Sequence, residues 1–136
     1  MIRLEQVQFR LGSRQLLQPL DLQIPQGQVC GLIGHNGSGK STLIKLLARQ
    51  QPATGGRILL DGEDLASYSS REFARRVAYL PQQRAATDQL TVRELVRFGR
   101  QPWHGLLGRF GPDDQRAVAR AMALTQIEPY ADRLVE

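Results

Sequence analysis

The chain has 136 residues, enough for one domain with its own core, and a formal net charge of +5 at pH 7. Its single cysteine excludes an internal disulfide, and no apolar run reaches the roughly 20 residues that a membrane span needs. The arginines are scattered and aromatic residues make up 6% of the chain, so the sequence lacks the basic block and stacking platform typical of nucleic-acid binding. We therefore interpret the net positive charge as a solvated basic surface near a membrane. The N-terminal sequence does not have the pattern of a signal peptide.

Two strands are predicted before the first functional motif. Apolar residues alternate over residues 2–9, and after a Gly-Ser turn a second strand is expected over residues 16–24. A Pro-Gln-Gly turn then leads into residues 28–33, a short apolar run. Such a run is typical of a buried parallel strand, so we expect Cys30 to be a core residue.

Residues 34–42 match the phosphate-binding loop pattern G-x-x-x-x-G-K-[ST] at every defined position. Glycines let the backbone turn tightly and bring its N–H groups up to a polyphosphate. Lys40 supplies a positive charge for the outer phosphates, and the Ser41 hydroxyl can bind Mg²⁺. A helix predicted over residues 42–48 adds its positive N-terminal end. The predicted nucleotide site therefore comprises Gly34, His35, Asn36, Gly37, Ser38, Gly39, Lys40, Ser41 and Thr42.

Downstream of this helix, a Pro- and Gly-rich break at residues 52–56 precedes a short strand predicted over residues 57–60. An Asp-Gly turn closes that strand. Residues 77–80 form a further apolar run, which we interpret as another buried strand. Residues 82–87 have no periodicity and are predicted to form a loop.

Two capping boxes of the form [ST]-x-x-E predict helix starts. They are formed by Ser69 with Glu72 and by Thr91 with Glu94. The helices are expected over residues 70–76, 92–98 and, opened by a proline, 112–124. Between the last two, Trp103 lies in an irregular segment with glycines nearby, where a core position and a surface position are both compatible with the pattern.

The combination of these features resembles the first half of an ABC transporter ATPase subunit over the whole chain. It consists of two strands before the phosphate loop, V-A-Y-L-P-Q at residues 77–82 and T-V-R-E-L at residues 91–95. The resemblance implies an α/β P-loop NTPase fold with an N-terminal antiparallel β subdomain, part of a parallel-sheet core and part of a helical subdomain. It also implies one partial domain, divided into residues 1–86 and residues 87–136.

A second resemblance narrows the family. The segment G-R-Q-P-W-H-G at residues 99–105, followed by G-R-F at residues 108–110, resembles ATPases of ferric-siderophore importers, the ferric hydroxamate type most of all. Such a protein would couple ATP hydrolysis to iron-siderophore import. The implied partners are permease subunits, a second copy of the chain and, indirectly, a periplasmic or surface siderophore-binding protein. The implied location is peripheral, on the cytoplasmic face of the inner cell membrane.

The resemblance also assigns residue roles, with ATP and Mg²⁺ as the cofactors. Gln82 stands where the family places a glutamine that senses Mg²⁺ and the attacking water and communicates with the permease. Gln82 and Lys40 are thus the implied catalytic residues, and Ser41 and Gln82 the implied metal contacts. Leu11 occupies the position of the aromatic residue on which the family stacks adenine, so this stacking partner is missing.

The resemblance also implies missing parts. The chain ends about where the family signature is expected, so we expect a truncated sequence without the catalytic base, and therefore without ATP hydrolysis of its own. Neither His35 nor His104 is placed to be the family's switch histidine. The early carboxylates are expected in turns: Asp61, Glu63 and Asp64.

Two alternatives remain open at this point. A small-molecule P-loop kinase is disfavoured because its phosphate loop usually follows the first strand, whereas two strands precede the loop here. The other alternative is a non-catalytic nucleotide-binding module. If neighbouring strands are missing, we expect an open apolar edge beside residues 28–33, with residues 34–40 still wrapped as an anion-binding nest.

Overall fold

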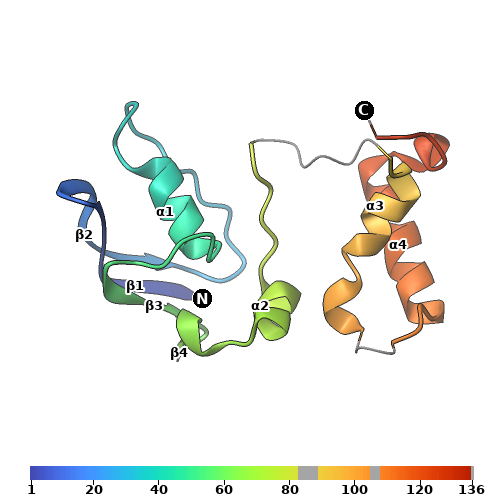
Figure 1. The fold of residues 1–136 in the computed structure, drawn as a ribbon. Helices are drawn as coiled ribbons and strands as arrows, with labels where there is room; N and C mark the ends of the chain where they lie inside the picture. Colours follow the sequence, from blue (N-terminus) through green and yellow to red (C-terminus); the bar gives the residue numbers. More distant parts are fainter. Residues whose placement is uncertain (83–88, 105–107, 136) are drawn as a thin grey trace. The chain divides into compact units, whose positions relative to one another are not determined.

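The computed structural model of the chain describes residues 1–82, 89–104 and 108–135. It divides into two compact units, Met1–Ala78 and Tyr79–Glu136 (Figure 1). The predicted division between residues 86 and 87 lies outside the described residues. Among the described residues, no helix combines the length and the apolar character needed to cross a membrane.

The first unit contains a four-stranded antiparallel sheet in the order β2-β1-β3-β4. Its strands are β1 (Ile2–Leu11), β2 (Arg14–Ile24), β3 (Gly55–Leu60) and the short β4 (Glu63–Asp64). β1 lies in the middle of the three long strands and is hydrogen-bonded to β2 on one edge and to β3 on the other. The strands predicted at residues 2–9, 16–24 and 57–60 are therefore confirmed.

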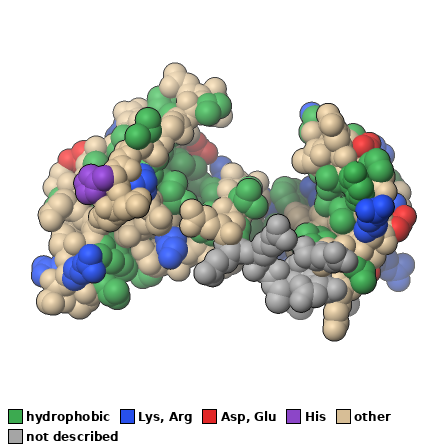
Figure 2. All heavy atoms as spheres, turned by 90° about the horizontal axis from the view of Figure 1, so that it is seen from above, with side chains coloured by type: hydrophobic (Ala, Val, Ile, Leu, Met, Phe, Trp, Pro, Cys, Tyr) green, Lys and Arg blue, Asp and Glu red, His purple; other side chains and the backbone are tan. Residues whose placement is uncertain are grey.

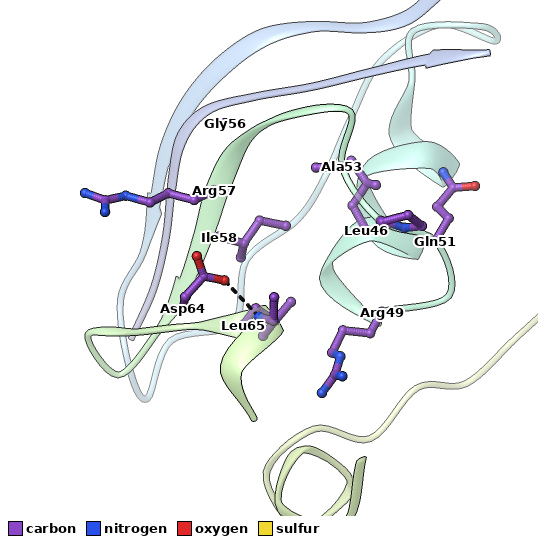
Figure 3. Close-up of a pocket in the computed structure, with 11 residues that line it drawn as sticks. Leu46, Arg49, Gln51, Ala53, Gly56, Arg57, Ile58, Asp64 and Leu65 are labelled. Carbon is purple, nitrogen blue, oxygen red and sulfur yellow. Dashed lines mark hydrogen bonds between the residues drawn. The ribbon is translucent and has the colours of Figure 1, made fainter. Parts of the chain in front are cut away.

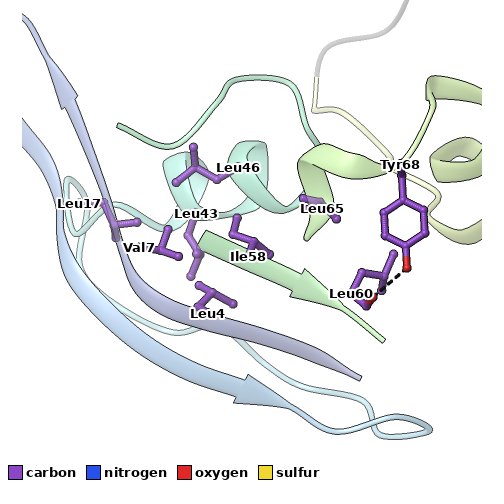
Figure 4. Close-up of a cluster of buried hydrophobic side chains, with 9 residues drawn as sticks. All are labelled: Leu4, Val7, Leu17, Leu43, Leu46, Ile58, Leu60, Leu65 and Tyr68. Atoms are coloured by element: carbon purple, nitrogen blue, oxygen red, sulfur yellow. Dashed lines mark hydrogen bonds between the residues drawn. The ribbon is translucent and has the colours of Figure 1, made fainter. Parts of the chain in front are cut away.

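One helix, α1 (Lys40–Leu47), covers a face of this sheet (Figures 1 and 4). Leu43 and Leu46, three residues apart on one side of the helix, point toward the strands. The Tyr68 hydroxyl closes one end of the core by donating a hydrogen bond to the carbonyl oxygen of Leu60 at 2.8 Å. The buried cluster consists of Leu4, Val7, Leu17, Leu43, Leu46, Ile58, Leu60, Leu65 and Tyr68.

The first unit ends with the short 3-10 helix η1 (Leu65–Ser67) and the helix α2 (Ser70–Arg76). The predicted capping box of α2 is present: the amide of Glu72 donates to Ser69 Oγ at 3.2 Å, and the amide of Ser69 donates to Glu72 Oε2 at 2.9 Å. Hydrogen bonding of the Glu72 carboxylate to the Ser69 side chain, followed by that to the Ser69 amide, lowers the pKa of Glu72 below its ordinary value. The helix therefore begins where the local pattern predicts.

Two predicted strands are wrong. Residues 28–33 and 77–80 have no strand structure, and Val29, Ile33 and Leu80 are almost fully exposed. Cys30, predicted to be a core residue, is exposed as well. The physical reason is that no described strand lies beside either run to accept its backbone hydrogen bonds. Hydrophobic side chains are accordingly visible on the molecular surface in Figure 2.

The described residues of the second unit include two α-helices, α3 (Val92–Phe98) and α4 (Pro112–Thr125), which begin where the sequence predicts. The 3-10 helices η2 (Gln101–Trp103) and η3 (Glu128–Tyr130) complete it. Its buried cluster is Val118, Met122 and Ala131. Backbone hydrogen bonds join the start of α3 to the C-terminal segment, among them one from the amide of Val92 to Arg133 O at 2.9 Å.

Asp114 in the first turn of α4 is the one charged residue in the buried set of the described chain. Its carboxylate accepts hydrogen bonds from the amide of Gly111 at 2.9 Å and from Arg100 Nε at 2.8 Å, and it lies 3.0 Å from His104 Nε2. The Gly111 hydrogen bond, followed by that of Arg100, holds the pKa of Asp114 far below its ordinary value. Trp103 is 43% exposed beneath the Arg100 guanidinium, so of its two compatible positions the surface one is found.

Candidate nucleotide-binding site

The predicted phosphate loop leads directly into α1. Gly37 and Gly39 have φ values of +84° and +88°, a left-handed conformation that favours glycine. Gly39 is the N-cap residue of α1, and its carbonyl accepts the helical hydrogen bond from the amide of Leu43 at 2.8 Å. Within the loop, the amide of Ser38 donates to His35 O at 3.2 Å. The loop is thus a tight turn whose two left-handed residues are both glycines.

The loop folds around the side chain of Lys40. Its ammonium donates to the carbonyl oxygens of Gly34 at 2.6 Å and of His35 at 2.7 Å, and lies 3.4 Å from Ser38 Oγ. The structure therefore brings together residues of the first, middle and last parts of the motif. The result is a fixed positive charge inside a ring of backbone, as a site for a polyphosphate requires.

The remaining predicted loop residues lie beside this ring. Ser41, in the first turn of α1, is exposed and Thr42 is half-buried, while Asn36 is exposed at the tip of the loop. His35 is also exposed, with its Nδ1 2.9 Å from the carbonyl oxygen of Asn36. The N-terminal end of α1, which attracts anions, and the exposed hydroxyl of Ser41 therefore both lie next to the loop.

The donor set suits Mg²⁺ held together with a nucleotide better than a metal held by protein alone. Among the described residues, no group of three or more His, Cys, Asp or Glu side chains could hold a metal ion. Mg²⁺ prefers oxygen ligands and is commonly bound through one or two protein groups together with substrate phosphates. Ser41 can supply one such protein oxygen.

A pocket of about 510 Å³ adjoins the loop. One wall is the β2 segment from Gln15 to Leu20 and the other is the loop with Lys40. No aromatic ring is among the described residues that line it, and Leu11 is exposed at the end of β1, outside the lining. The missing stacking partner noted in the sequence is therefore not replaced by another aromatic residue of this pocket.

Gln82, the other predicted catalytic residue, is exposed and belongs to the second unit. Its roles in catalysis and metal binding remain predictions. Most of the predicted loop at residues 82–87 lies outside the described residues. Of the early carboxylates expected in turns, only Asp61 lies in one. The expectation is wrong for Glu63 and Asp64, which form β4 because they pair with β3 after the turn, and an Asp64 oxygen caps η1.

A second pocket of the first unit, of about 400 Å³, contains none of the predicted site residues (Figure 3). Its floor is apolar, formed by Leu46, Ala53, Ile58 and Leu65. The side chain of Arg57 points away from it and is bound to Glu5 instead, with Arg57 Nε 2.6 Å from Glu5 Oε2. None of the described residues that line it carries an ammonium group held by backbone carbonyls, as Lys40 does in the phosphate loop.

Comparison with known proteins identifies relatives over nearly the whole chain. The family model described as ABC transporter matches residues 17–136. The ferric enterobactin transport ATP-binding protein FepC of Escherichia coli (strain K12) is 38% identical over 99% of this chain and 50% of its own length. The iron(3+)-hydroxamate import ATP-binding protein FhuC of Bacillus subtilis (strain 168) is 36% identical over 97% of this chain and 49% of its own length. The chain thus spans about half the length of these relatives.

The fold has solved counterparts. The dimeric, post-hydrolysis structure of the ATP-binding cassette MJ0796, bound to ADP and Pi, matches 98% of this chain and 61% of its own chain with a TM-score of 0.78 and 21% identity. A structure described as the ATP-binding subunit of an ABC transporter gives a TM-score of 0.80 at 22% identity, over 98% of this chain and 54% of its own. The cassette fold predicted from the sequence is therefore confirmed, and the kinase alternative is set aside.

Proposed function

The chain belongs to the ABC transporter family, and we propose that its protein couples ATP binding and hydrolysis to import of an iron-siderophore complex through a membrane permease. Support for the substrate class comes from relatives whose names specify ferric enterobactin and iron(3+)-hydroxamate. Support for nucleotide binding comes from one geometric observation, the enclosure of the Lys40 ammonium by the carbonyl oxygens of Gly34 and His35.

This enclosure prepares Lys40 for a phosphate. An ammonium group has three N–H donors, and two of them point to carbonyl oxygens at 2.6 and 2.7 Å. The third contact, to Ser38 Oγ at 3.4 Å, is long, so a phosphate oxygen can replace it while the two carbonyl contacts stay in place. The charge is therefore positioned before the nucleotide binds, and little reorganisation is needed.

The other loop groups act on the same phosphates. Backbone amides of the loop and of the N-terminal end of α1 would donate to phosphate oxygens, and Ser41 Oγ would hold the accompanying Mg²⁺. Bound Mg²⁺ would supply neutralisation of phosphate charge. Gln82 orients the attacking water in this proposal. The catalytic base is not among the residues assigned here, so we expect no hydrolysis by the chain alone.

The remaining parts of the proposal concern the assembly. Two copies of the subunit bind ATP and associate with the permease subunits. A siderophore-binding protein acts indirectly by delivering the substrate. The subunit is peripheral, on the cytoplasmic face of the inner membrane. Dimerisation is supported by the solved cassette MJ0796, which is described as a dimer.

A thermal-shift measurement with Mg-ATP tests nucleotide binding. At 100 times its dissociation constant a ligand stabilises the folded state by about 2.7 kcal/mol, so a clear rise in Tm is expected. Lys40→Ala should abolish the rise and EDTA should reduce it. Lys45→Ala is the matched control, because Lys45 is an exposed lysine on the same helix and lies outside the loop. An equal rise in Lys40→Ala would show that the loop is not the site.

A further inference from the structure

β2 is irregular where it passes the phosphate loop. Phe9 and Arg10 are consecutive in β1, but their partners in β2 are Leu17 and Gln15. Leu16 is thus an extra residue, a β-bulge in the ladder. The Gln15 side-chain amide stabilises this local course of the chain by donating to the carbonyl oxygen of Leu17 at 2.5 Å. Bulges redirect backbone groups out of the ladder and are common beside functional sites.

The bulge lies against the last glycine of the phosphate loop. A Cβ atom added to Gly39 would be 2.8 Å from the Leu16 carbonyl oxygen and 3.3 Å from Leu17 Cδ1. The first distance is shorter than real side chains allow, so the backbone of Gly39 packs directly on the bulge. Both its left-handed φ and this contact therefore restrict the position to glycine.

Leu17 connects this contact to the core. Its side chain is 9% exposed and belongs to the same buried cluster as Val7 and Leu43, as Figure 4 shows. The other arm of the loop has no comparable support, since residues 28–33 pair with no described strand. The bulge and α1 are thus the supports of the loop within the described part of this unit.

We infer that the β2 bulge positions the phosphate loop, with Leu17 as a positioning residue for nucleotide binding. The Leu16 carbonyl and the Leu17 side chain hold Gly39 in its left-handed conformation. Gly39 is the N-cap residue of α1, and its conformation in turn sets the orientation of Lys40, the first residue of that helix. This inference rests on the proposed nucleotide binding for its affinity readout, although the contact itself does not.

The test compares two leucines of one core. Leu17→Ala and Leu60→Ala remove the same atoms from sites that are 9% and 6% exposed, but Leu60 lies at the Tyr68 end of the cluster. Mg-ATP affinity is measured for the full chain at a temperature where each variant is fully folded by circular dichroism. We expect Leu17→Ala to weaken affinity on the order of tenfold and Leu60→Ala to leave it unchanged. Leu17→Val and Leu60→Val form a milder pair if an alanine variant does not fold.

A nucleotide-free measurement separates this inference from the proposed function. Amide hydrogen exchange of peptides covering residues 34–43 should be faster in the Leu17 variant than in the Leu60 variant. If the unmodified chain fails to bind Mg-ATP, the proposed function is wrong, and the exchange comparison still decides the role of the bulge. Equal exchange rates in the two variants, or equal losses of affinity, would overturn the inference.

Discussion

The strand β1 and the run of residues 28–33 are both apolar, but only β1 is buried. Leu4 and Val7 of β1 are 1% and 0% exposed, whereas Val29 and Ile33 are 104% and 94% exposed. β1 has hydrogen-bonded partners on both edges and α1 over one face, while the run has no described strand beside it. Apolar composition therefore predicts burial only where the chain also supplies partners for the backbone.

The energetic reason lies in the backbone. A peptide group moved from water into an apolar environment without a hydrogen bond costs about 1–3 kcal/mol by protein mutational data. An unpaired strand of several residues would incur this cost repeatedly, and the gain from burying its side chains would not offset it. Paired substitutions at closely packed and at open positions of the chain test this explanation.

The largest difference is expected between Leu46→Ala and Ile33→Ala. Leu46 is 1% exposed in the core, so truncation should lower the free energy of unfolding by about 2–5 kcal/mol through lost burial and a residual cavity. Ile33 has no burial to lose, and its truncation should stay within about 0.5 kcal/mol. Urea denaturation of the chain measures both. Similar losses would mean that residues 28–33 are buried in solution.

A smaller difference is expected between two glycines, both with positive φ. A Cβ on Gly56 would overlap the carbonyl oxygen of Gln6, whereas at Gly37 nothing lies within 4 Å. Each alanine substitution should cost about 1–3 kcal/mol for the left-handed conformation. Gly56→Ala should cost about 1–3 kcal/mol more, because the backbone of β1 must move. Equal urea midpoints for the two variants would contradict this close packing.

The capping boxes should act equally in both units, because their partners are only three residues away. Ser69→Ala and Thr91→Ala should each lower helix stability by about 1 kcal/mol. Circular dichroism during urea denaturation measures the loss. Ser69→Asp is the control, since an aspartate oxygen can also accept the hydrogen bond from the Glu72 amide, and it should restore most of the stability.

The last expected effect is a loss of stability in acid that depends on Asp114. The Gly111 and Arg100 hydrogen bonds lower the pKa of Asp114 in the folded state, so the unfolded chain takes up the proton first. The stabilisation is complete above the unfolded-state pKa of about 3.9 and is lost as the pH falls toward the folded-state pKa. Trp103, the single tryptophan, stacks beneath Arg100, so its fluorescence between pH 6 and pH 2 follows the transition.

Asp114→Asn is the control for this titration. The variant keeps the shape of the side chain but has no carboxyl to protonate, so its unfolding in acid should depend less on pH. Its stability at pH 7 should be lower, because the amide cannot accept both hydrogen bonds as a carboxylate does. Identical acid midpoints for Trp103 fluorescence in the two proteins would show that Asp114 is not the group responsible.

Local patterns accounted for much of the fold and of the candidate site. The capping boxes at Ser69 and Thr91, the starts of α3 and α4, and the loop leading into α1 all depend on residues within about four positions of one another. The partners of these hydrogen bonds are therefore specified by the local sequence, although the stability of such short helices still depends on packing. The resemblance to the cassette family rested on the same local motifs, and the comparisons confirmed it.

Contacts between residues far apart in the chain could not be predicted from the sequence. Apolar runs at residues 28–33 and 77–80 suggested buried strands, but burial depends on partners elsewhere in the chain. The local sequence around Asp114 gives no sign of Arg100, which lies 14 positions earlier and reaches Asp114 only in the fold. The bulge at Leu16 had no sequence signature, since it appears only in the pairing of β2 with β1.

The sequence by itself determined that this protein carries a phosphate loop, because glycines and a lysine at fixed spacing set the backbone turn and the charge. Only the tertiary structure decided what supports that loop: the backbone of Gly39 packs on the Leu16 carbonyl, between residues 23 positions apart in the chain. The reason is physical. Short-range hydrogen bonds follow from the residue types alone, whereas a close backbone contact depends on how the whole sheet and helix pack together.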